Sequence, residues 1–438
     1  EDSSEDSCDN PDWREARLAS SRFLNVFIRV HPPVNPWSPR VRDLLYSLAT
    51  GSEPRLDKFV SSERQFSRYQ DWQFEAINSV RGTVWEAIIH LALKEKNFPD
   101  QGAGLVSKWI PELLAQRLSP DVGESPAVFS LLGSQMRLLV YVLPTWIRGN
   151  LDLLLPPDRL DCLDALIDGH LAYDQPHKFV VETVPELLGA ALDLVERRAK
   201  SASESSDEGD RRRDIGSRLG FHISFYAWND WFTSPEYAEN LLSRFRSVAT
   251  ASARAETLGH IGSVFEKTEA GEEVDQLFDR AREILDRWLQ WIEESMRKSP
   301  DYLDNYEAEL GQFADLVAAE CFPFSWRVNT ASRALSLIKS PSRSFQLLDT
   351  LEHWAEQGDE NPERLAASIR LLATLTGKLS TELRWSIRSV KISPILRRGL
   401  AHDDPGFRAQ ATVALENLLR HGFYDLLDLV DDSECKRQ

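Results

Sequence analysis

The sequence predicts an all-α protein, an α-solenoid of helix pairs arranged in two halves. Three observations predict it: apolar side chains at three- and four-residue spacing, short polar or proline-containing breaks, and a scarcity of the alternation that strands require. Helix pairs with brief connections bury their apolar stripes only against neighbouring pairs, which is the building principle of a solenoid.

Amphipathic periodicity places most of the expected helices. The clearest runs over 274–296, where Phe278, Ala281, Leu285 and Trp288 recur among charged side chains. Similar patterns predict helices over 74–94, 131–147, 161–171, 180–197, 235–248, 308–319, 362–376 and 407–419. Because the breaks between them are short, consecutive helices are expected to pair.

The chain is expected to divide into four parts. An acidic run predicts a disordered linker over 1–12, and a helical repeat region follows over 13–200. A polar stretch with charges in blocks predicts a flexible loop over 201–214, before a second helical repeat region over 215–438. The chain begins at Glu1 and not at a methionine, so we expect it to be a fragment. An enzymatic domain could then lie upstream of it.

The loop 201–214 has two interpretations. As a flexible or cleavable segment, it would expose Ser201, Glu208, Arg211, Arg212 and Arg213. Alternatively, its three arginines could bind an anionic surface, but the acidic residues just before them would neutralise that charge. We favour a solvated loop.

Composition and charge exclude several classes of function. With 69 acidic and 51 basic residues the formal charge is -18, which repels phosphate backbones and disfavours general nucleic-acid binding. Cys8, Cys162, Cys321 and Cys435 form no C-x-x-C pair, so reduced thiols are expected. No stretch reaches the roughly 20 apolar residues that a membrane span needs, and no secretory signal opens the chain. The expected location is the cytoplasm, away from membranes.

The short motifs that mark common catalytic sites are missing. G-x-x-x-x-G-K-[ST], G-x-S-x-G and H-E-x-x-H do not occur, and no G-x-G-x-x-G follows a strand. We therefore expect no catalytic residues, no cofactor and no metal site. Glu182 and Glu186 resemble a carboxylate pair on one helix face, but a solvent-facing acidic stripe is the favoured interpretation in so acidic a chain.

An aromatic segment, GFHISFYAWNDWF at 220–232, contains the candidate partner-binding residues. Exposed aromatic side chains dominate interface hot spots, so a recognition surface would use His222, Tyr226, Trp228 and Trp231. The competing interpretation is packing in the core, which is more common for a helical stripe. We favour packing in the core. Both interpretations would hold if the helix lay at the edge of a groove.

A second segment, GHLAYDQPHKF at 169–179, contains three side chains that could ligate a metal. They are His170, Asp174 and His177, but Pro176 would break a helix that fixed their spacing, and no cysteine accompanies them. We favour ordinary polar residues of a loop.

The segment 394–422 resembles a HEAT repeat. Leu396 and Leu400 lie on a first expected helix, the turn contains Asp403, Asp404 and Pro405, and a second helix opens with Phe407 and Arg408 and continues with Ala411, Ala414, Leu415 and Leu418. The resemblance implies that a turn acid and the arginine pair between successive repeats. Phe407 departs from the pattern, which usually has valine there. We accordingly expect HEAT-like helix pairs.

A broader resemblance covers 77–93, 125–147 and 277–326. The segments INSVRGTVWEAIIHLAL, SPAVFSLLGSQMRLLVYVLPTWI, LFDRAREILDRWLQWIEES and YEAELGQFADLVAAECFPFSW are similar to C-terminal helical regions of large bacterial anti-phage defence proteins. In those proteins an upstream STAND-type ATPase or sirtuin-type NADase is joined to a helical array. The resemblance implies a sensor that binds a phage component or an effector protein of the same system.

Three functions remain open at this level. The chain is expected to be a non-catalytic protein-binding module, the sensor of an anti-phage defence protein. It could instead be a stand-alone scaffold or adaptor for host proteins, or the protein substrate of a partner effector such as a protease. The reading frame and gene neighbourhood separate the first two, and limited proteolysis with the partner proteins tests the third.

Overall fold

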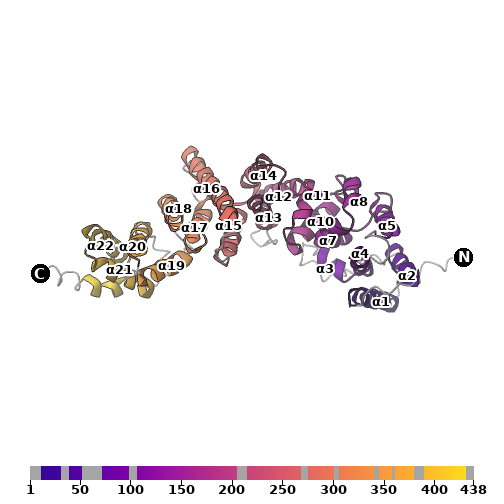
Figure 1. Ribbon diagram of the computed structural model, residues 1–438, viewed down its shortest axis with the longest axis horizontal. Helices are drawn as coiled ribbons and strands as arrows, with labels where there is room; N and C mark the ends of the chain where they lie inside the picture. Colours follow the sequence, from indigo (N-terminus) through magenta and orange to yellow (C-terminus); the bar gives the residue numbers. More distant parts are fainter. Residues whose placement is uncertain are drawn as a thin grey trace. The chain divides into compact units, whose positions relative to one another are not determined.

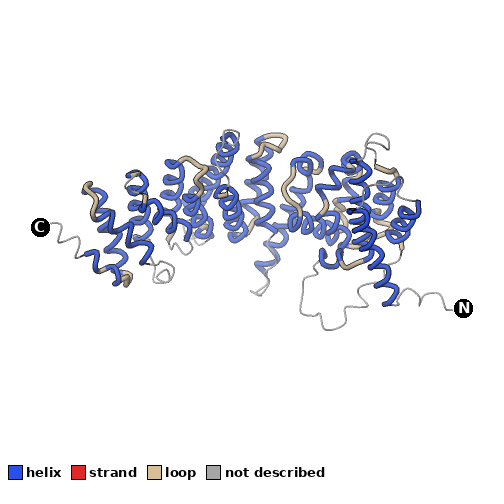
Figure 2. The backbone as a smooth tube through the Cα atoms, turned by 60° about the horizontal axis from the view of Figure 1, so that its bottom comes forward, coloured by secondary structure: helices blue, strands red, loops and turns tan. Residues whose placement is uncertain are grey.

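Helices account for all the regular structure that is described. The computed structural model describes residues 11–30, 39–51, 72–97, 106–204, 215–267, 275–299, 305–339, 345–357, 361–378 and 389–430. Within these ranges there is no strand (Figure 2). The all-α prediction is confirmed, and the helices pack mainly on near neighbours in the sequence, as in an α-solenoid.

The chain forms two compact units, and each is described by itself. Unit 1 comprises Glu1–Tyr226 and Asp230–Val248, and unit 2 comprises Ala227–Asn229 and Ala249–Gln438. Unit 1 contains the following helices (Figure 1): α1 (Pro11–Val30), α2 (Pro39–Thr50), α3 (Trp72–Ile77), α4 (Val80–Asn97), α5 (Trp109–Leu118), α6 (Pro126–Ser134), α7 (Met136–Val142), α8 (Pro144–Gly149), α9 (Leu151–Leu154), α10 (Leu160–Tyr173), α11 (Lys178–Thr183), α12 (Glu186–Glu204), most of α13 (Ile215–Trp228) and α14 (Pro235–Val248).

Unit 2 begins with α15. Its helices are α15 (Ala251–Glu266), α16 (Asp275–Lys298), α17 (Glu307–Asp315), the 3-10 helix η6 (Leu316–Ala318), α18 (Phe324–Leu337), α19 (Phe345–Glu356), α20 (Pro362–Thr376), α21 (Ser389–Leu400), α22 (Pro405–Arg420) and the 3-10 helix η8 (Tyr424–Leu426). None of the helices in the described part of the chain combines the length and the apolar character that a membrane span demands.

The division between the units lies near residue 248, whereas we expected the two halves to meet at the loop 201–214. α13 stays with unit 1 because Arg218 donates a hydrogen bond to the carbonyl of Leu171 in α10. α14 packs against α12. Residues 201–204 belong to α12, and the rest of the expected loop lies outside the described residues. Most of the expected linker, residues 1–10, also lies outside them.

Within each unit, the helices pack mainly against helices that are near them in the sequence. In unit 1, α4 packs against α1, α2 and α6; α10 then packs against α6 and α12. In unit 2, α17 packs against α15 and α18, and α20 against α18, α19 and α22. Tryptophans fill both cores, because Trp85, Trp228, Trp288 and Trp354 are fully buried.

Three of the expected helices are interrupted. The helix expected over 74–94 breaks at Ser79, whose hydroxyl accepts a hydrogen bond from the amide of Gly82 at 2.9 Å at the start of α4. The helix expected over 131–147 breaks at Gln135 and again before Pro144, and the one expected over 180–197 breaks before Pro185. Proline disfavours the helical conformation in the residue that precedes it. Leu143 before Pro144 and Val184 before Pro185 accordingly leave the helical region, with φ of -129° and -134°.

The segment 394–422 falls on the last helix pair, α21 and α22. Asp404 caps α22 by accepting the amide of Gly406 at 2.6 Å; Ala411, Ala414, Leu415 and Leu418 are buried, whereas Phe407 is half-buried. Within the described residues, the hydrogen bonds of Arg408 differ from the expected pairing with a turn acid of another repeat. Arg408 donates instead to the carbonyls of His402 and Asp403 in its own turn, at 2.6 and 2.7 Å.

A buried carboxylate joins three helices of unit 2. Glu309 in α17 accepts hydrogen bonds from Nε of Arg254 in α15 and from Nε1 of Trp288 in α16, both at 2.9 Å. The Arg254 guanidinium also lies over the rings of Trp291 and Tyr306. Because Glu309 pairs with polar atoms of both Arg254 and Trp288, the network fixes the positions of α15, α16 and α17 relative to one another.

Candidate functional site

Two glycines bring α6 and α10 into close contact in unit 1. A Cβ atom at Gly169 in α10 would lie 2.0 Å from the carbonyl oxygen of Ser130, and one at Gly133 in α6 would lie 2.0 Å from that of Leu166. Only glycine permits this crossing. It places the next residue of α10, His170, in the interior of the unit.

His170 lies in a buried cluster of polar side chains. Its Nδ1 is 3.3 Å from Oδ2 of Asp174, one helical turn later, and both side chains are almost fully buried. Asp174 accepts hydrogen bonds from the backbone amides of Arg137 and Gln175, each at 3.0 Å. Neither ring nitrogen of His170 makes a hydrogen bond with the described residues.

The cluster continues into α13. The ring of His222 meets that of His170 edge-on, with the centroids 5.2 Å apart. Nδ1 of His222 is 3.5 Å from the hydroxyl of Tyr226. The cluster of His170, Asp174, His222 and Tyr226 therefore joins two segments that the sequence analysis had treated separately.

Burial keeps two members of this cluster, His222 and Tyr226, neutral. It lowers the pKa of His222 well below its usual range, and the charges of His170 and Arg218 lower that pKa further. Burial also raises the pKa of Tyr226. These groups can exchange hydrogen bonds inside the unit, but in the ionised form each would be costly, so the arrangement suits a structural core.

Three of the four candidate partner-binding residues on 220–232 lie in the interior, which agrees with the favoured interpretation. His222, Tyr226 and Trp228 are buried, because they face the interior of their units; Trp228 packs on Phe265 in unit 2. Trp231 is half-buried and packs edge-on against Phe225. The competing interpretation, packing in the core, is confirmed for the buried three.

The three residues considered as metal ligands do not converge on one point. His170 and Asp174 are neighbours, whereas Nδ1 of His177 accepts a hydrogen bond from the amide of Phe179 at 3.3 Å, at the start of α11. No group of metal-ligating side chains forms within the described residues. Of the loop candidates, Ser201 lies in α12, and Glu208, Arg211, Arg212 and Arg213 lie outside the described residues.

The two described cysteines are free thiols of low reactivity. Cys162 is buried and Cys321 is half-buried. Burial raises the pKa of Cys162 to about 12 and that of Cys321 to about 11. Because the thiolate is the reactive form, neither is prepared to act as a nucleophile.

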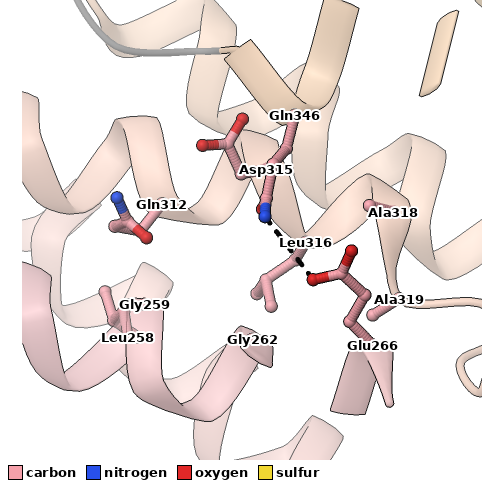
Figure 3. A pocket seen from close by; sticks show the side chains of 10 residues that line it. All are labelled: Leu258, Gly259, Gly262, Glu266, Gln312, Asp315, Leu316, Ala318, Ala319 and Gln346. Atoms are coloured by element: carbon pink, nitrogen blue, oxygen red, sulfur yellow. Dashed lines mark hydrogen bonds between the residues drawn. The ribbon is translucent and has the colours of Figure 1, made fainter. Parts of the chain in front are cut away.

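A groove in unit 2 brings together side chains from α15, α17, η6 and α19. Small residues supply much of its lining, and amides and carboxylates supply the rest (Figure 3). The lining consists of Leu258, Gly259, Gly262, Glu266, Gln312, Asp315, Leu316, Ala318, Ala319 and Gln346. Figure 3 shows Gln346 reaching toward Glu266, to which its Nε2 donates a hydrogen bond at 3.5 Å.

Asp315 gives the groove a carboxyl group that titrates near neutrality. Burial raises its pKa to about 7, and the nearby charge of Asp349 raises it too, although a hydrogen bond from the amide of Leu347 at 3.0 Å opposes the shift. The carboxyl can therefore donate or accept a hydrogen bond at physiological pH.

The sequence gives little indication of this groove. Gly259 and Gly262 are three residues apart on α15, and this spacing places both on one helix face; it was the one signal available. The amides that complete the groove come from Gln312 and Gln346, on other helices, and nothing in the sequence pairs them with the glycines.

No protein-family model matches the sequence, and a search of curated proteins found no match.

Proposed function

We propose that this chain is a non-catalytic protein-recognition module, in which a partner protein docks over the mouth of the small groove of unit 2. The observation that carries the proposal is the make-up of the groove: small residues line it beside side-chain amides and carboxylates. The space between these residues is only large enough for a water-sized group. A partner would therefore lie over the mouth of the groove, where side-chain amides and carboxylates can pair with its backbone amides and carbonyls.

The groove residues divide this task between them. Gly262 leaves space at the groove, since a Cβ there would meet its nearest neighbour, Cδ2 of Leu316, only at 3.5 Å, whereas Gly259 is covered by Oε1 of Gln312. Gln312 and Gln346 can each donate and accept hydrogen bonds with peptide groups. Glu266 adds a negative charge that favours a basic side chain on the partner.

The charge of the chain supports a basic partner. A formal charge of -18 attracts cationic protein surfaces over distances of about 10 Å at ordinary salt. The association rate should therefore fall as ionic strength rises, as stopped-flow measurements at several salt concentrations would show. A rate that does not change with salt would contradict electrostatic steering.

The resemblance to anti-phage sensors supports a more specific role. Groove residues from Gln312 to Ala319 belong to the segment 306–326, one of those on which that resemblance rests. We propose that the chain is a HEAT-like sensor of a bacterial defence protein, acting in the cytoplasm. Its partner would be a phage component or an effector protein of the same system.

Affinity capture with a blocked groove tests the proposal. Gly262→Leu would fill the groove, because the nearest atom to a Cβ there, Cδ2 of Leu316, is at ordinary contact distance, 3.5 Å. Gly149→Leu is the matched control, since a Cβ at this exposed position in unit 1 meets nothing within 4 Å.

Wild-type chain and both variants would be used as bait in lysates of phage-infected and uninfected bacteria, followed by mass spectrometry. A protein retained by the wild type and by Gly149→Leu, but lost with Gly262→Leu, supports the proposal. Retention of the same protein by Gly262→Leu would refute the role of the groove.

A further inference from the structure

The outer face of α1 in unit 1 is apolar and exposed. α1 packs against α4 (Figure 1), and on its inner face Leu24 and Ile28 are buried. On the opposite face, Phe23, Val26 and Val30 are 67%, 59% and 68% exposed. A helix with apolar side chains on both faces is suited to two packing partners.

The spacing on this outer face is that of a helix-helix seam. Its residues recur at three- and four-residue steps, with every member uncharged; they are Ala16, Ala19, Phe23, Val26 and Val30. Alternating steps of three and four define the heptad pattern of two helices that pack side by side. The outer face of α1 is therefore built to pack along a second helix.

The sizes of these side chains change along the seam. The first half, at Ala16, Ala19 and Ser20, is small and exposed. The second half is bulky, and there Phe23 stacks on Phe27 with the ring centroids 5.9 Å apart. In a helix of the same sequence that runs in the opposite direction, Ala16 would face Val30 and Ala19 would face Val26, while Phe23 would meet its own copy at the centre.

Charges beside the seam have the same symmetry. Glu15, Arg22 and Arg29 are seven residues apart, so they share one flank of the seam. In an antiparallel pair, Glu15 of each helix would lie opposite Arg29 of the other, giving two attractive contacts, although Nη1 of Arg29 also lies 3.9 Å from Oε1 of Glu86 in its own chain. Arg22 would lie near its own copy, but its guanidinium donates to Oδ1 of Asn78 at 3.0 Å within its own chain, which holds it aside.

We propose that the outer face of α1 binds a second copy of this chain, as an antiparallel and two-fold symmetric helix pair. Such an interface uses the same surface on both copies, so one helix must be complementary to itself when reversed. The face of α1 meets this condition both in size and in charge. The inference does not depend on the proposed partner groove.

Sedimentation of the full chain tests the pairing. The wild type should form a dimer at micromolar concentrations and dissociate on dilution. Val26→Glu places one carboxylate from each copy in the seam and should weaken the dimer by at least about a hundredfold. Because Val26 is exposed in the single chain, far-UV circular dichroism and the melting temperature should not change. The control Val413→Glu alters an equally exposed valine, on α22, and should leave the dimer intact.

A charge exchange tests the orientation. Glu15→Arg and Arg29→Glu should each weaken the dimer, by up to about tenfold, and the double variant should recover most of the loss. A wild type that stays monomeric at tens of micromolar overturns the proposal, and so does a Val26→Glu variant that remains dimeric. Failure of the double variant to recover would overturn the antiparallel arrangement.

Discussion

Single glycines determine how closely the helices of unit 1 can approach. A methyl group at position 169 would collide with the carbonyl of Ser130 at 2.0 Å, and backbone atoms cannot move aside cheaply. Gly169→Ala should therefore lower the free energy of unfolding by about 2 to 4 kcal/mol. Chemical denaturation would measure the loss.

Gly189→Ala provides the control for this prediction. Gly189 lies in α12, where a Cβ would meet nothing within 4 Å. Alanine is the better helix former by about 1 kcal/mol, so this variant should be neutral or more stable. A similar loss of stability in both variants would contradict the role assigned to the close crossing of α6 and α10.

The neutral state of His222 makes the stability of unit 1 depend on pH. The pKa of His222 is lowered in the folded chain, where His170, Asp174, Arg218 and Tyr226 surround it. The unfolded chain therefore takes up a proton first as the pH falls. Its contribution to stability is complete above the unfolded pKa of about 6.5 and is lost as the pH falls toward the folded pKa.

Replacing His222 should flatten this dependence. In His222→Asn the loss of stability between about pH 7.5 and pH 5 should shrink by up to about 1.4 kcal/mol per pH unit. Denaturation midpoints across this pH range provide the measurement, and His260→Asn, at an exposed position, is the control. An unchanged pH profile in His222→Asn would show that His222 is not the titrating group.

At the scale of elements, a buried ion pair holds three helices of unit 2 together. Glu309→Ala would leave the Arg254 guanidinium buried without its carboxylate. Removing one partner of such a pair should lower the free energy of unfolding by about 3 to 5 kcal/mol. Glu256→Ala, at an exposed position on α15, should change it by about 0.5 kcal/mol or less. Equal effects of the two changes in thermal or chemical unfolding would contradict the account.

The periodicity of the sequence predicted the helices better than their interruptions. The segments expected at 235–248 and 362–376 coincide with α14 and α20, because apolar stripes of 3.6-residue period extend over their whole length. The breaks at Leu143 and Val184 were missed, although a proline follows each one. The apolar pattern continues across these breaks, since the helices on both sides face the same core.

At the scale of the whole molecule, the sequence indicated two halves but not where they meet. The polar stretch 201–214 looked like a boundary, yet contacts of Arg218 and His222 tie α13 to α10. Such contacts join residues about 50 positions apart, and no local pattern reveals them. The histidine cluster and the groove of unit 2 escaped prediction for the same reason.

The central claim is that the groove of unit 2 is a recognition surface. Hydrogen-deuterium exchange of the chain with and without its captured partner tests this most directly, because it reports protection along the whole backbone. The account predicts that protection on binding is strongest in α15, α17, η6 and the first turn of α19. Protection confined to unit 1, with no change in these four elements, would contradict it.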